Sequence, residues 1–171
     1  MMISNVCQRL RCGVAELTDL LSRFPVSVTQ LALRFAVAVP FFKSGLTKWD
    51  GPLQLSDSAV YLFTEEFKLH VFGLELAYPF PHVMAFLAGS AEIVLPVLLV
   101  LGLATRFAGL GILAMTAIIQ LTIPDGWANF HLPWAAMALA IVTYGPGRIA
   151  LDHLIAGMLR TDTRPRVPSE A

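Results

Sequence analysis

Glu92 is the residue of this sequence best placed to do chemistry, because it lies near the middle of a long apolar run. It is the single charged residue of the run MAFLAGSAEIVLPVLLVLGL. A charged side chain at the centre of a membrane span costs about 2.5 kcal/mol or more. A cation, a proton or a ligand is therefore expected to compensate this carboxyl.

Two cations, Arg34 and Lys43, lie within another apolar run and are the predicted partners of Glu92. Lys43 is nearer to Glu92 in depth, but the cations are nine residues apart, about 180° around an ideal helix. Both can face Glu92 only if Pro40 bends the helix between them. Gln120, near the end of a third apolar run, lies at a similar depth. We predict an intramembrane polar cluster of Arg34, Lys43, Glu92 and Gln120.

Three interpretations of Glu92 stay open at this point. It forms a buried ion pair or a protonated carboxyl that fixes helix register, it takes part in a proton, quinone or solute site, or it faces lipid. The alternative interpretation of Arg34 is that its long side chain extends toward the cytoplasmic headgroups. The alternative interpretation of Gln120 is that it forms a hydrogen bond between helices.

Four further candidates lie at the predicted outer boundary of the membrane: Lys48, Trp49, His131 and Trp134. Because tryptophan and lysine gather at membrane interfaces, these residues are interpreted first as interface anchors, with contact to a ligand as the alternative.

The residues that could bind metal or exchange disulfides are too few. Glu66 and His70 have the spacing of two ligands on one helical face, but two ligands do not complete a site. Cys7 and Cys12 are the chain's two cysteines, five residues apart, and lack the C-x-x-C spacing of a dithiol oxidase. We therefore expect no metal and predict no catalytic residue, and the cofactor stays undetermined, with quinone as the candidate.

The composition predicts an integral membrane protein of one domain. Of the 171 residues, 56% are hydrophobic and 14% charged, and the mean hydropathy is +0.68. Since a span needs about 20 mostly apolar residues, we predict an all-α membrane four-helix bundle with spans over about 30–49, 83–103, 107–123 and 132–144. The 12 basic and 12 acidic residues cancel, which argues against nucleic acid as a partner.

Three other segments are predicted to be amphipathic helices at the membrane surface. They lie within about 1–28, in the first outer loop along Val60, Phe63, Phe67 and Val71, and after the fourth span. Residues 161–171 are predicted to form a polar tail. Arginines outside the spans collect on one side, so both termini are predicted to be cytoplasmic.

Three motifs carry a resemblance to a known family. They are SGLTK at 44–48, AEIVLPVLLVLGLATR at 91–106 and GPGRIALD at 145–152. The chain resembles the DoxX family of small four-helix bacterial membrane proteins. The resemblance implies the bacterial inner membrane and a link to quinone, sulfur or copper chemistry.

The functional expectation is an accessory or anchoring subunit of a redox or stress-related membrane system, not an autonomous enzyme. If it is redox-linked, it would be a subunit of a quinone-coupled oxidoreductase. Its expected partners are the lipid bilayer, a redox or cytoplasmic protein, and a second copy of itself. A small-solute or proton transporter and a docking platform for a cytoplasmic enzyme are the alternatives.

Overall fold

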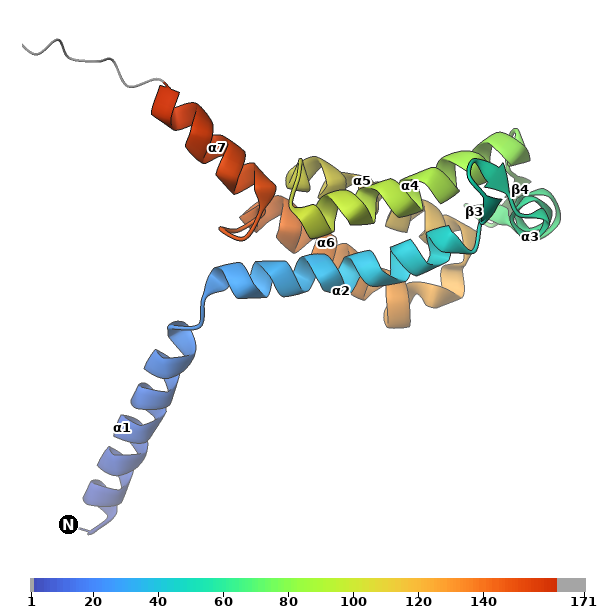
Figure 1. The fold of residues 1–171 in the computed structure, drawn as a ribbon. Helices are drawn as coiled ribbons and strands as arrows, with labels where there is room; N and C mark the ends of the chain where they lie inside the picture. The colour runs from blue at the N-terminus through green and yellow to red at the C-terminus, as the bar shows by residue number, and fades with distance from the viewer. Residues whose placement is uncertain (1, 163–171) are drawn as a thin grey trace, which may run out of the picture.

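The computed structural model describes residues 2–162 and is mostly helical (Figure 1). Most of the predicted polar tail, residues 163–171, lies outside this range. The α-helices are α1 (Met2–Ser22), α2 (Val26–Leu46), α3 (Asp57–Tyr61), α4 (Pro81–Leu101), α5 (Thr105–Thr122), α6 (Leu132–Tyr144) and α7 (Leu151–Asp162). Three shorter helical segments are η1 (Leu62–Glu66), η2 (Pro124–Gly126) and η3 (Trp127–His131).

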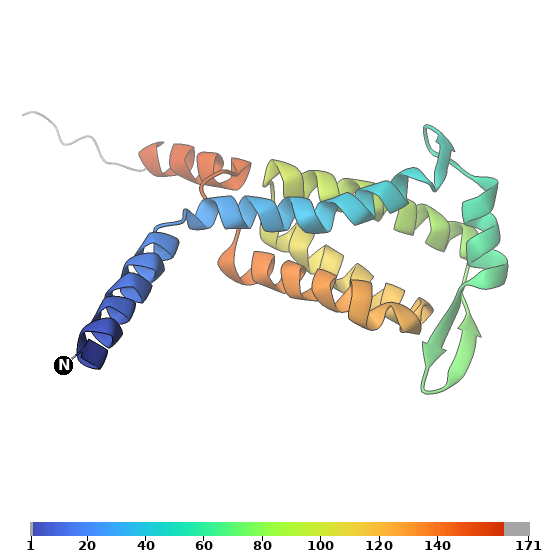
Figure 2. The same cartoon turned by 90° about the horizontal axis from the view of Figure 1, so that it is seen from below.

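Helices α2, α4, α5 and α6 lie side by side (Figure 2). Helix α2 packs against α4 and α6, and α5 packs against the same two helices. Burial of apolar side chains stabilises this arrangement, and each of the four helices contributes to one continuous core. Its buried members are Val37, Phe41, Leu99, Ala108, Ile112, Ala138 and Ile141.

Glycines allow these helices to approach one another closely. A Cβ atom at Gly45 would lie 3.0 Å from the Cβ of Glu92, so α2 contacts α4 almost backbone to backbone. Gly111 plays the same part between α5 and α4, since a Cβ added there would lie 2.9 Å from the side chain of Leu95. Because lipid is as apolar as a leucine side chain, membrane helices depend on such close packing for their association.

Three of the packed helices, α2, α4 and α5, are long and apolar enough to cross a membrane. The lipid environment also explains why α4 carries exposed apolar side chains along its length, including Val83, Val94 and Leu101. Helix α6 has 13 residues and rises about 20 Å, less than the hydrocarbon core of about 30 Å.

Two small β-hairpins correct the all-α expectation. Strand β1 (Trp49–Gly51) pairs with β2 (Gln54–Leu55), and β3 (Lys68–Val71) pairs with β4 (Leu74–Ala77), both antiparallel. Phe72 and Gly73 connect β3 to β4 with φ angles of 49° and 82°. Such a two-residue turn with positive φ matches the twist of a hairpin.

The predicted amphipathic helix of the first outer loop is therefore wrong over its second half. The helical segments α3 and η1 end at Glu66, and the residues that follow form β3. Glu66 is the last residue of η1 and His70 lies in β3, so the two do not share a helical face as expected. Helix α2 also ends at Leu46, which places Trp49 in strand β1 rather than at the end of a span.

The bundle has two unlike ends (Figure 2). Both hairpins and α3 lie at one end, which we call the hairpin end. Helices α1 and α7 extend from the opposite end, which we call the terminal end.

Asp152, the first acidic residue of α7, holds the terminal end together. Its carboxylate accepts hydrogen bonds from the backbone N–H groups of Ala104 (2.8 Å) and Thr105 (2.9 Å) at the start of α5. Its own N–H donates to the carbonyl of Gly102 at 2.9 Å. Burial opposes ionisation of Asp152, but the hydrogen bonds from Thr105 and Ala104 and the charge of Arg34 outweigh it and lower the pKa.

Replacement of this carboxylate should destabilise the protein in a pH-dependent way. We expect Asp152→Asn to lower the free energy of unfolding by about 1 kcal/mol near pH 7, the usual size of a helix-cap effect. A carboxyl whose pKa is lowered by folding stabilises the protein above its unfolded pKa, and this contribution is lost as the pH falls through the folded pKa. Thermal unfolding in detergent should therefore show the variant and wild type converging below about pH 4. Asp50→Asn, on an exposed strand residue, is the matched control. An equal deficit at all pH values would contradict a role for the charge.

Candidate functional site

Glu92 pairs with Lys48, at the hairpin end of the bundle. The ammonium Nζ of Lys48 lies 2.5 Å from Oε2 of Glu92, and the two side chains are 12% and 7% exposed. The same ammonium donates to the hydroxyl of Ser44 at 3.2 Å. Glu92 belongs to α4 and Ser44 to α2, so the lysine just beyond α2 joins the two helices through a nearly buried ion pair.

This pair corrects the predicted partners of Glu92. Gly45 contacts Glu92, and Lys43, two residues earlier, is turned about 200° away and is exposed. Arg34 lies eleven residues before Gly45, about 16 Å along α2. Lys48 lies three residues after Gly45 and four after Ser44, so it shares the face of α2 that meets Glu92.

Arg34 is fully buried near the terminal end. Its Nη1 donates to the carbonyl of Leu99 at 3.2 Å, and its Nη2 donates to the carbonyl of Ile149. The last carbonyls of a helix carry partial negative charge, so a cation is favourable at the end of α4. The guanidinium fits here only because residue 102 is a glycine, since a Cβ at that position would lie 2.2 Å from Nη1.

Gln120 pairs with His131, across the turn between α5 and α6. Nδ1 of His131 lies 2.6 Å from Oε1 of Gln120, and the amide nitrogen of Gln120 donates to the carbonyl of Pro124 at 3.0 Å. With the amide oxygen as acceptor, Nδ1 carries the donated proton. His131 is buried, and its ring abuts Gly126, where a Cβ would lie 2.5 Å away.

The predicted cluster therefore divides into separate contacts. Glu92 is joined to Lys48, Arg34 to backbone carbonyls, and Gln120 to His131, while Lys43 makes no such contact with another described residue. Spacing along the sequence predicted the depth of each side chain and the angle between Arg34 and Lys43, but not which face of α2 packs against α4.

The two boundary tryptophans are half-buried and pack against other rings of the protein. Trp49 lies edge to face with Phe86, at a ring separation of 5.3 Å, and its indole nitrogen is buried against Gly89 without a hydrogen-bond partner. Trp134 contacts the rings of Phe41 at 5.0 Å and His131 at 5.5 Å. Both residues thus also hold helices together at the hairpin end.

The described residues contain no group of three or more histidine, cysteine, aspartate and glutamate side chains that could hold a metal ion. His70 instead lies beside the carbonyl of Leu121, with 3.1 Å between Nδ1 and the oxygen. Its other ring nitrogen is 3.9 Å from Glu75, its neighbour across the β3–β4 hairpin.

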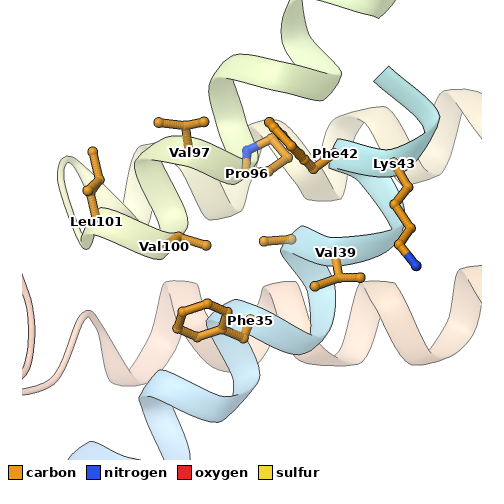
Figure 3. Close-up of a pocket in the computed structure, with 9 residues that line it drawn as sticks. Phe35, Val39, Phe42, Lys43, Pro96, Val97, Val100 and Leu101 are labelled. Atoms are coloured by element: carbon orange, nitrogen blue, oxygen red, sulfur yellow. The ribbon is translucent and has the colours of Figure 1, made fainter. Parts of the chain in front are cut away.

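A groove of about 360 Å³ between α2 and α4 is a further candidate that the sequence analysis did not identify (Figure 3). The spacing of Phe35, Val39 and Lys43 places them on one side of α2, and this could have indicated one wall of the groove from the sequence. The groove itself could not be predicted, because its other wall lies on α4 and includes Val97 and Val100.

These features define the class: a small helical membrane protein whose apolar helices are joined by buried polar contacts. The sequence signature of the DoxX family matches residues 29–125, which include most of α2, both hairpins, α4 and α5. The chain belongs to the DoxX family. An uncharacterized protein of Haemophilus influenzae is 27% identical over 142 residues, covering 75% of this chain and 83% of that protein. No solved structure matches.

A double-mutant cycle should measure the coupling between Lys48 and Glu92. We expect Glu92→Gln or Lys48→Met alone to lower the free energy of unfolding by about 3 kcal/mol, because each leaves one buried charge without a partner. The double variant should recover much of that loss. Thermal and denaturant unfolding in detergent are the measurements.

Lys43→Met is the matched control for this cycle, since Lys43 is exposed, and it should leave stability nearly unchanged. If Glu92→Gln kept wild-type stability, Lys48 would not depend on the carboxylate, and the pair would be better understood as part of a ligand site.

Proposed function

We propose that this DoxX protein is an accessory or anchoring subunit of a redox or stress-related system in the bacterial inner membrane. The observation that supports this proposal best is that buried polar side chains of the bundle bind one another or the backbone. Glu92, Arg34 and Gln120 each make contacts that join one part of the bundle to another. Such contacts favour a stable scaffold over a reaction centre. The redox or stress setting is what the family resemblance implies.

The amphipathic helix α1 supports an anchoring role. Its exposed apolar side chains form one stripe, while Glu16, Asp19 and Arg23 lie off it. The helix extends away from the bundle at the terminal end (Figure 1). The stripe is formed by Val14, Leu17, Leu20 and Leu21, and Phe24 follows just beyond the end of the helix. We infer that it lies in the headgroup region or against a cytoplasmic protein.

We also propose four spans with the terminal end in the cytoplasm. Helix α6 follows η3 directly, so 127–144 together provide the fourth span. Arg11, Arg23, Arg106 and Arg148 lie at or near the terminal end, and the charge bias of bacterial membrane proteins places arginine inside. The hairpin end contains Asp50, Asp57, Glu65, Glu66, Glu75 and Asp125.

A proton or solute transporter is the second candidate function, and the buried Lys48–Glu92 pair is the observation in its favour. The core between this pair and Arg34 opposes it, because Val37, Phe41 and Leu99 fill that space with apolar groups. An ion would cross this region without ligands, at high cost.

The proposed topology can be tested by labelling in intact cells. In a variant with Cys7 and Cys12 changed to serine, a membrane-impermeant thiol reagent should modify a cysteine placed at Asp57 or Asp125. It should spare one at Arg106 until the cells are opened. Labelling of the Arg106 position from outside would reverse the orientation.

The proposed anchoring role predicts that α1 recruits the partner. We expect Leu17→Glu with Leu21→Glu to abolish co-purification of cytoplasmic proteins without changing the melting temperature, because the stripe makes no part of the bundle core. Ala15→Glu with Ser22→Glu, which adds the same charge away from the stripe, is the matched control. Quantitative mass spectrometry of the gently purified protein is the measurement. Unchanged partners in the stripe variant would argue against recruitment by α1.

A further inference from the structure

The groove between α2 and α4 has apolar walls and a single charged residue, Lys43. Figure 3 shows Phe35 at one end of the α2 wall and Lys43 at the other, with Val97 and Val100 on α4 opposite. Phe35 and Lys43 are eight residues apart, so this wall is about 12 Å long. These dimensions suit an extended hydrocarbon chain.

The groove opens on the side of the bundle, toward lipid. Its walls belong to two helices of membrane-spanning length. Phe35, Val39 and Val97 are 45%, 47% and 41% exposed, so no other described part of the chain covers them. The hydrocarbon region around these helices supplies acyl chains at every such opening.

Lys43 adds a requirement for negative charge. It lies three residues before the end of α2, about 4.5 Å below that end, and forms no hydrogen bond or ion pair with another described residue. Because Lys43 is exposed and unpaired among the described residues, its long stem is free to turn and bring the ammonium to the headgroup level. There the nearest anions are lipid phosphates.

We propose that this groove binds one acyl chain of an anionic phospholipid whose phosphate pairs with Lys43. Net negative charge in the headgroup strengthens the pairing, so a lipid such as phosphatidylglycerol is favoured over a zwitterionic lipid with the same chains. The proposal rests on the membrane-spanning helices and is independent of the accessory role.

A second copy of the chain fits the groove less well. Among α2, α4, α5 and α6, Glu92 is the only acidic residue, and Lys48 already pairs with it. The acids of α1 lie at the terminal end, away from Lys43. The acids of the hairpin end, such as Asp50 and Asp57, lie beyond the end of α2 and not along the groove. A phospholipid supplies both the acyl chain that fills the groove and the phosphate that pairs with Lys43, whereas a second bundle supplies no acid within the groove.

Native mass spectrometry of the full chain tests the proposal. The delipidated protein is mixed with phosphatidylglycerol or phosphatidylcholine of identical chains, and the fraction that retains one lipid is measured. We expect wild type to prefer phosphatidylglycerol. Lys43→Gln should reduce its affinity about five-fold, the equivalent of about 1 kcal/mol. Lys43→Arg should preserve the preference.

A second pair of variants tests the groove itself. Val97→Trp, which fills it, should abolish retention of both lipids. Leu139→Trp, on the exposed face of α6, makes the same kind of change elsewhere and should leave retention unchanged. Melting temperatures close to wild type establish that the variants are folded.

Three outcomes would overturn the proposal: equal retention of the two lipids by wild type, full retention by Lys43→Gln, or full retention by a folded Val97→Trp. A dimer that Val97→Trp dissociates would assign the groove to a second copy instead. None of these results bears on recruitment by α1, so this proposal and the accessory role can fail separately.

Discussion

The structure depends on one constraint: a charged group among membrane helices must find its partner within the protein or in a lipid headgroup. Glu92 meets it through Lys48, and Arg34 meets it through the carbonyls of Leu99 and Ile149. Each solution joins segments that are distant in sequence. The cost of an unpaired charge in hydrocarbon thus fixes how α2 and α4 lie against each other.

The same constraint makes the two ends of the bundle different. At the terminal end, the cation Arg34 binds the carbonyl end of α4, and the anion Asp152 binds the N–H end of α5. Each charge is opposite in sign to the partial charge of the helix end that it binds. Both residues thereby fix the turn between these helices and the start of α7. At the hairpin end, side chains pair with side chains instead, as in Gln120 with His131. These side-chain pairs act beside backbone contacts such as that of His70 with the carbonyl of Leu121.

Much of the fold could be predicted because hydropathy and spacing are local properties. The apolar runs located α2, α4 and α5, and the motif GPGRIALD contained the Asp152 that closes the terminal end. The β3–β4 hairpin was not predicted. Val71 and the preceding Phe67 also suit a helical stripe, and the turn at Phe72–Gly73 together with cross-strand pairing decides in favour of the hairpin.

The sequence by itself determined that this is a membrane protein of the DoxX family and that Glu92 needs a compensating charge. Only the tertiary structure decided that Lys48 supplies it, and that Lys43 is left facing a groove. Depth can be counted along a helix, since each residue adds a fixed rise. The direction in which a side chain points depends on which face of the helix packs against a neighbour. Here the contact of Gly45 with α4 turns Lys48 toward Glu92 and Lys43 away from it.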